Sequence, residues 1–204
     1  MGIIVFAPIR ISLFLVLLLA ASSLADARGR LPKEIAGFDL QGISIYDEPG
    51  LGFSARYWMD EKEQKFDVYL YTAGVADLGS GVNDRVAQEF KSLFVQISEM
   101  ERLGYYADVT DPQTGSGTIN LDGSDVGFLW GRVQFRQTDK GREVTHVESQ
   151  DIRSSYVFIT AYQGRFLKVR YTLLSDDLEA GTDAFMAIME DFERRFSQPE
   201  LPLP

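Results

Sequence analysis

Two strand-like segments joined by the turn pair Gln163-Gly164 make up "YVFITAYQGRFLKVRYTLL", Tyr156–Leu174. Both alternating sets of residues in YVFITAY are apolar, which is typical of a strand covered on both faces. A two-residue turn places Ile159 opposite Lys168. We therefore predict an antiparallel hairpin with its first strand at the centre of a sheet.

The chain before this hairpin also alternates with a period of two residues in several segments. Shorter strands are predicted at Tyr105–Val109 and, as an addition, at Thr118–Leu121. Longer strands are predicted at Phe38–Tyr46, Leu51–Asp60, Lys65–Ala73, Phe128–Gln137 and Glu143–Gln150. We expect a mostly antiparallel sheet of about seven strands.

Two segments change to the helical period of three and four residues. The first ends at Gly104, a typical glycine after a helix C-terminus, and its apolar stripe consists of Val82, Val86, Phe90, Leu93, Ile97, Met100 and Leu103. The second, with Thr182 or Asp183 as the expected cap, carries Phe185, Ile188, Met189, Phe192 and Phe196. Strands with two long amphipathic helices predict an α+β fold, an α/β/α sandwich.

The beginning of the chain resembles a signal peptide. An apolar run of about fourteen residues, Ile11–Leu24, follows Arg10, and this is shorter than the roughly 20 residues needed to cross a bilayer. We predict cleavage and a periplasmic or secreted protein without stable membrane insertion. An uncleaved anchor is the alternative, because Ile3–Ala7 is apolar as well.

The remaining organisation is simple. We predict a signal peptide at 1–27, a single domain at 28–197 and a flexible Pro-rich tail at 198–204. The chain has no cysteine, so it has neither a lipidation site nor disulfides, and the exported fold must be held by its core.

Composition excludes several classes of function. The net charge is −10, from 20 basic and 30 acidic residues, which disfavours nucleic acid as a partner. A single histidine and no cysteine make a transition-metal site improbable, and neither a P-loop nor a dinucleotide fingerprint is present, so no cofactor is expected. A hydrolase or carbohydrate-active enzyme that uses two carboxylates remains an alternative.

The histidine, His146, lies two residues from Glu148, as an oriented general base often does. A three-residue turn at 139–141 would instead pair Arg132 with Glu148 and Val133 with Val147, which sorts polar and apolar residues onto opposite faces. We predict that His146 lies on a polar sheet face and has no catalytic role.

Two pairs of basic residues are the candidate ligand site. Residues an even number of positions apart on a strand point to the same face. Arg132 and Arg136 therefore share one face of their strand, and Lys168 and Arg170 share one face of theirs. If both pairs lie on the same side of the sheet, this acidic protein carries a local positive patch that can receive a carboxylate, a phosphate or an acidic partner segment.

An aromatic group is the candidate partner surface. Trp58, Tyr69 and Tyr71 alternate with the apolar core residues of two neighbouring strands, so they point to the opposite face. They are available to a protein partner if no helix covers them.

The order of strands, a helix, further strands ending in this hairpin, and the closing helix "DAFMAIMEDFERRF" (Asp183–Phe196) resembles the PsbP-like class of small exported α/β/α domains. The resemblance covers the mature chain and implies a non-catalytic accessory or binding domain whose surfaces and loops meet a partner. Because a fold does not fix a function, it transfers no residue roles. We expect a binding or accessory module for a protein partner or a small anionic ligand.

Overall fold

A computed structural model describes residues 31–48, 50–60, 64–138, 140, 152–174 and 177–196. From Pro32 onward these residues belong to one compact unit. Within them lies one sheet of nine antiparallel strands: β1 (Glu34–Ile35), β2 (Phe38–Ile45), β3 (Phe53–Met59), β4 (Gln64–Tyr71), β5 (Tyr106–Ala107), β6 (Gln113–Leu121), β7 (Ser124–Gln137), β8 (Ile152–Tyr162) and β9 (Arg165–Leu174).

The strands follow the order β1-β2-β3-β4-β9-β8-β7-β5, and β6 also pairs with β7. The α+β class and the antiparallel sheet are thus confirmed, but the expected number of about seven strands is too low. The strand without a predicted counterpart is β1, which has only two residues. Such a short strand carries too few residues to show a period in the sequence. The strand predicted at Tyr105–Val109 is present as β5, which also has only two residues.

The predicted final hairpin is confirmed in its register. Ile159 lies opposite Lys168 and Val157 opposite Arg170, across a turn in which Gln163 and Gly164 both have positive φ. Nine of the eleven residues of β8 are buried, and they belong to both alternating sets, so both faces of the strand are covered as expected. Both of its edges are paired as well, with β7 and β9.

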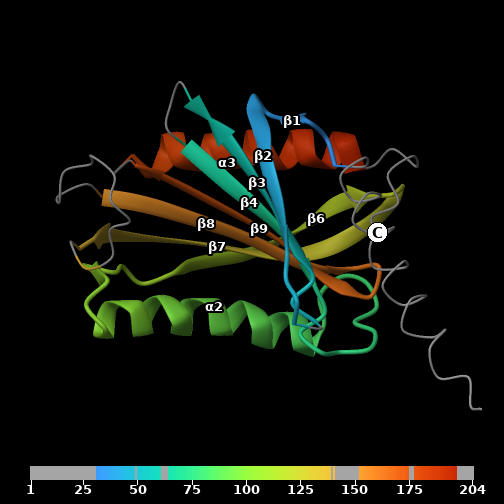
Figure 1. Ribbon diagram of the computed structural model, residues 1–204, viewed down its shortest axis with the longest axis horizontal. Helices are drawn as coiled ribbons and strands as arrows, with labels where there is room; N and C mark the ends of the chain where they lie inside the picture. The colour runs from blue at the N-terminus through green and yellow to red at the C-terminus, as the bar shows by residue number, and fades with distance from the viewer. Residues whose placement is uncertain are drawn as a thin grey trace, which may run out of the picture. The chain divides into compact units, whose positions relative to one another are not determined.

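Two helices cover opposite faces of the sheet (Figure 1). They are α2 (Asp84–Arg102) and α3 (Leu178–Phe196). We call the two sides the α2 face, with Val157 and Ile159, and the α3 face, with Tyr156 and Phe158, since neighbouring residues of a strand point in opposite directions. Within the described residues no helix is both long and apolar enough to span a membrane.

The α3 face is a dense aromatic core. Tyr57 stacks on Phe66 with ring centres 4.6 Å apart, and Phe185 of α3 stacks on Tyr156 and Tyr171 at 5.4 and 6.5 Å. Tyr156 and Tyr171 are buried, and buried aromatic side chains make large contributions to the stability of a core because of the area that they cover.

The α2 face has a smaller core. It consists of Tyr71, Leu78, Val86, Phe90, Val157, Ile159, Ala161 and Phe166. Of all the α2 residues only Val86 and Phe90 are buried, and both belong to the first half of the helix.

Both helices differ from their predicted ends. Asn83 caps α2 by accepting hydrogen bonds from the amides of Arg85 and Val86, so Val82 lies outside the helix and is 44% exposed. Gly104 follows the helix with φ 77°, as predicted. The helix α3 begins before the expected caps, because the Asp177 carboxylate accepts from the amides of residues 179 and 180.

The predicted partner of β7 is wrong. Arg132 lies opposite Tyr156 of β8 on one side and Gln113 of β6 on the other, and Val133 lies opposite Ser155. Both neighbouring positions are filled, which leaves no place for Glu148 beside Arg132. His146 and Glu148 themselves, the signal peptide and the tail lie outside the described residues.

Candidate functional site

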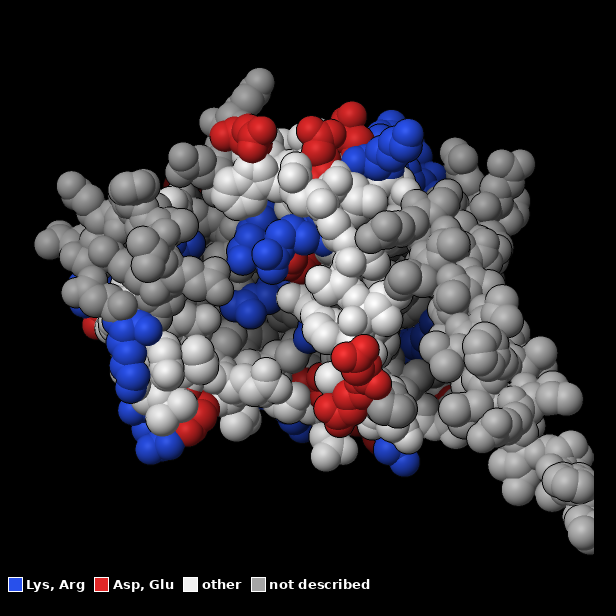
Figure 2. All heavy atoms as spheres, viewed as in Figure 1, with Lys and Arg blue, Asp and Glu red and all other residues white. Residues whose placement is uncertain are grey.

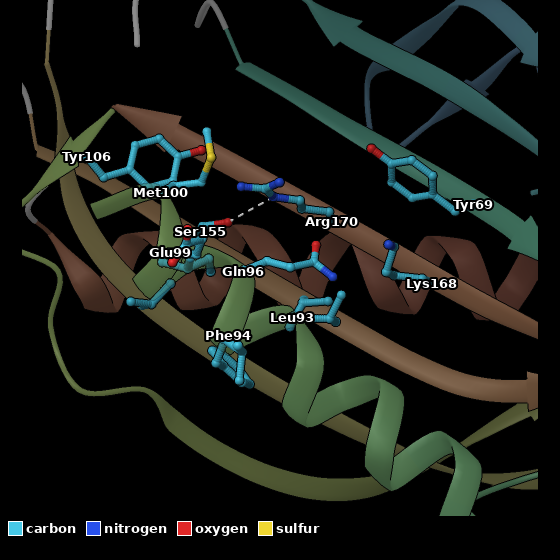
Figure 3. A pocket seen from close by; sticks show the side chains of 14 residues that line it. Tyr69, Leu93, Phe94, Gln96, Glu99, Met100, Tyr106, Ser155, Lys168 and Arg170 are labelled. Atoms are coloured by element: carbon cyan, nitrogen blue, oxygen red, sulfur yellow. Dashed lines mark hydrogen bonds between the residues drawn. The ribbon is translucent and has the colours of Figure 1, made fainter. Parts of the chain in front are cut away.

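A groove with a volume of about 570 Å³ lies between the second half of α2 and the sheet. Figure 3 shows α2 on one side of it and the strands on the other. The helix contributes Leu93, Phe94, Val95, Gln96, Ile97, Glu99 and Met100, and the strands contribute Tyr69, Tyr106, Val133, Ser155, Val157, Lys168 and Arg170. Its volume is within the usual range for a small-molecule site.

The groove begins where the close contact of α2 with the sheet ends, near the middle of the helix. A Cβ atom on Gly131 of β7 would come within 2.5 Å of the Phe94 ring and 3.1 Å of the Phe90 ring, so the helix lies directly on this glycine. The apolar stripe continues past this point, but Ile97 and Met100 are only half-buried. Their side chains form a wall of the groove instead of a core.

Lys168 enters the groove from β9 above two aromatic rings. Its Nζ lies 4.5 Å from the ring centre of Tyr69 and 5.1 Å from that of Tyr71, both within the range of cation–π contacts. Burial lowers the pKa of Lys168, the charge of Glu89 opposes this shift, and the charge of Arg170 adds to it. The charge of Glu89 therefore offsets only part of the effect of burial on the ammonium group of Lys168.

Arg170 lies two residues further along β9, on the same face. Its Nε donates a hydrogen bond of 3.3 Å to Ser155 Oγ, the dashed line in Figure 3. Asp67 lies directly opposite Arg170 in β4, but it accepts a 2.9 Å hydrogen bond from Arg56. No ion pair found within the described residues includes Lys168 or Arg170.

Basic side chains are visible in a hollow above α2 in the space-filling view (Figure 2). Glu99 is the single carboxylate among the residues that line the groove. Arg102 binds it with hydrogen bonds of 2.7 and 2.5 Å, which lower the pKa of Glu99. A general acid needs a raised pKa, so Glu99 does not have the property expected of one.

The single basic patch that the sequence suggested does not form. Arg132 pairs in register with Tyr156 and therefore lies on the α3 face, whereas Lys168 and Arg170 pair with Ile159 and Val157 on the α2 face. The alternation of residues along one strand shows which of them share a face, but it does not show whether that face is the same as a given face of another strand when the register between the strands is unknown.

The two arginines of β7 have structural partners of their own. Arg132 donates to Gln113 at 2.9 and 2.5 Å and to Thr182 of α3 at 2.7 Å. Arg136 forms an ion pair with Asp108. These contacts connect β7 to β6, to α3 and to the residues after β5.

The three aromatic residues proposed as a partner surface have different environments. Tyr71 is covered by α2, with 8% exposure and a 2.7 Å hydrogen bond from its hydroxyl group to Glu89, so the condition that no helix covers the three residues is not met for Tyr71. Tyr69 is half-buried in the groove, and Trp58 is half-buried on β3. The groove itself was missed by the sequence analysis, although the unbroken apolar stripe of α2 was the signal for an apolar surface there.

Metal binding was not expected, and the described residues hold no cluster of three or more His, Cys, Asp or Glu side chains able to ligate a metal ion.

Comparison with known proteins gives a limited result. No family model matches the chain, and no curated protein matches it. Among solved structures, the chain is similar to cyanobacterial PsbP (CyanoP) from Synechocystis sp. PCC 6803, with a TM-score of 0.37 and 10% identity over 76% of this chain and 85% of that one. The similarity is one of fold, and it transfers no residue role.

Proposed function

We propose that this chain is a non-catalytic binding module and that the groove between α2 and the sheet holds a small anionic ligand. One observation carries the proposal: Lys168 and Arg170 bring two cationic groups to the same groove in a protein with a net charge of −10, and no described carboxylate forms an ion pair with either.

Physical chemistry supports an anion at this place. Lys168 is half-buried, so its ammonium group loses part of its hydration, and a bound anion restores favourable interactions to it. Arg170 adds a planar set of donors that matches a carboxylate or a phosphate. The signal-like sequence at 11–24 supports export, so the module would meet its ligand outside the cytoplasm.

A catalytic alternative gains no support from the groove. Two-carboxylate hydrolysis needs a protonated acid beside a second carboxylate. The lining offers Glu99 alone, with a lowered pKa.

Thermal unfolding of the full chain with acetate, phosphate and citrate tests the proposal. A ligand present at a hundred times its dissociation constant adds about 2.7 kcal/mol to the free energy of unfolding. We expect Lys168→Met and Arg170→Gln to abolish the gain, and Arg85→Gln, an exposed position on α2, to retain it. A gain that persists in both groove variants would place the anion elsewhere, and no gain with any anion would direct the search to protein partners.

A further inference from the structure

We infer that the ligand of the groove is a linear amphipathic monocarboxylate, whose carboxylate contacts Lys168 and Arg170 and whose aliphatic chain lies along α2. This inference rests on the proposed anion site and names the chemistry of its ligand.

The groove has a cationic end and a more apolar end. In Figure 3, Lys168 lies on one side of Arg170, and Met100 and Tyr106 lie on the other. Glu99 also lies on that second side, where it forms an ion pair with Arg102. Tyr106 stacks on Phe135 with ring centres 4.1 Å apart. A ligand bound along the groove would therefore have its charged group at one end and meet apolar surface towards the other.

The apolar wall distinguishes this site from one for an inorganic anion. The groove is lined by Phe94 and Ile97 of α2 and by Val133 and Val157 of the sheet, beside the polar residues Gln96, Glu99 and Ser155. An inorganic ion would leave this surface in contact with water, whereas an alkyl chain would cover it. Each buried methylene group should tighten binding about fourfold.

The length of the chain follows from the helix that lines the groove. The lining residues of α2 extend from Leu93 to Met100, seven residues apart. At about 1.5 Å per residue this distance is about 10 Å. An extended aliphatic chain advances by about 1.3 Å per carbon, because its C–C bonds of about 1.5 Å follow a zigzag, so a chain of about eight to ten carbons has a similar length.

The charge balance favours a monoanion. Lys168 and Arg170 contribute two positive charges, and Glu89, which acts electrostatically on Lys168, contributes one negative charge. Asp67 and Arg56 neutralise each other through their ion pair, and so do Glu99 and Arg102. The difference, 2 − 1, is one positive charge, which a single carboxylate balances.

The test is a calorimetric titration of the full chain with butyrate, hexanoate, octanoate and decanoate at constant pH and ionic strength. We expect the affinity to rise about fourfold per methylene up to eight to ten carbons and then to level off. Octanol, which has the chain without the charge, should bind at least tenfold more weakly than octanoate. Lys168→Met and Arg170→Gln should each weaken decanoate binding at least tenfold.

Matched variants separate the chain from the charge. Met100→Gln should weaken decanoate binding several-fold and leave butyrate binding unchanged, whereas Met186→Gln, an exposed position on α3, should change neither. Circular dichroism and urea unfolding of each variant establish that it is folded.

The outcomes distinguish the two proposals. Affinity that depends on Lys168 and Arg170 but not on chain length would overturn this inference and leave the anion site in place. Absence of binding by any carboxylate or by inorganic phosphate would overturn both. Binding to phosphatidylglycerol vesicles without binding to decanoate would overturn the single-chain ligand in favour of a lipid headgroup. Chain-length dependence that survives in both groove variants would indicate non-specific partitioning and overturn both.

Discussion

On the α3 face Phe185 stacks on two buried tyrosines and Phe192 is fully buried, whereas on the α2 face only Val86 and Phe90 of the helix are buried. Both helices have 19 residues and an apolar stripe. The difference shows that an apolar stripe can form a sealed core on one side of a sheet and the wall of a groove on the other.

The attachments of the helices explain the difference. Near the beginning of α3, Thr182 accepts a hydrogen bond from Arg132 of the sheet. Near its end, Asp191 accepts a 2.6 Å hydrogen bond from the amide of Ala36, in the turn between β1 and β2. These two attachments hold α3 close to the strands along its length. In α2 the two buried residues belong to the first half, and the groove lies between the second half and the strands.

The largest expected contrast is in core truncation. Phe192→Ala should lower the free energy of unfolding by about 3–5 kcal/mol, because it creates a cavity in a fully buried position. Phe94→Ala should cost about 1 kcal/mol, since this ring is half-buried at the groove. Urea unfolding measures both values, and the comparison holds only if the m-values match that of the unaltered chain. Equal losses would mean that the two faces are packed alike.

The next contrast concerns a buried carboxylate. Burial by itself raises the pKa of Asp191, but the Ala36 amide and the guanidinium groups of Arg194 and Arg195 outweigh it and hold the pKa below its ordinary value. Asp191→Ala should cost about 1–3 kcal/mol at neutral pH, because it leaves the Ala36 amide without its acceptor. Asp191→Asn, which keeps an acceptor and removes the charge, should cost less.

This stabilisation depends on pH with a definite sign. A lowered folded-state pKa gives stability that is fully present above the unfolded value for Asp, about 3.9, and is lost as the pH falls through the folded value. Between pH 6 and pH 2, the free energies of unfolding of Asp191→Asn and of the unaltered chain should therefore approach each other as the pH falls. The matched change Glu99→Gln, in an exposed pair with Arg102 on α2, should be close to neutral at pH 7. A large loss there would contradict the comparison.

Two glycines offer a smaller contrast of the same kind. Gly181→Ala would bring a Cβ atom within 2.5 Å of the Tyr156 hydroxyl group, which donates to the Leu178 carbonyl at 3.1 Å in a buried site. We expect a cost of about 1–2 kcal/mol from overpacking, after the helix-favouring effect of alanine is included. Gly131→Ala should cost less, because the Phe94 ring that it meets can move into the groove. A larger cost for Gly131→Ala in urea unfolding would show that Phe94 cannot move.

The smallest effect concerns Lys168. Its pKa is lowered in the folded chain, mainly by burial, so the unfolded chain binds more protons between the lowered value and the ordinary one of about 10.4. The free energy of unfolding should rise with pH in that interval, and Lys168→Met should remove the rise.

The interval for this measurement ends near pH 10. Burial raises the pKa of Tyr69 to about 12, and the stability that this shift provides is lost as the pH rises above the ordinary tyrosine value of about 10. Unfolding by urea between pH 7.5 and 9.5 isolates the lysine, and a slope that Lys168→Met leaves unchanged would contradict the assignment.

Prediction from the sequence succeeded where contacts are local. The hairpin of β8 and β9 has the predicted register because a two-residue turn leaves one way to pair its strands. Gly104 follows α2 as its position suggested. Prediction failed for Arg132, because β7 pairs with β8 after fourteen intervening residues, 138–151, and no turn type sets the register over such a distance.

The amino-acid sequence by itself determined the α+β class, the two amphipathic helices and the pairing of the last two strands, since each follows from residue periodicity within a few turns of chain. The tertiary structure alone decided which face each basic residue occupies and that α2 leaves Ile97 and Met100 at a groove beside Lys168 and Arg170. Periodicity defines the sides of an element relative to each other, and only the register and spacing between elements decide what each side meets.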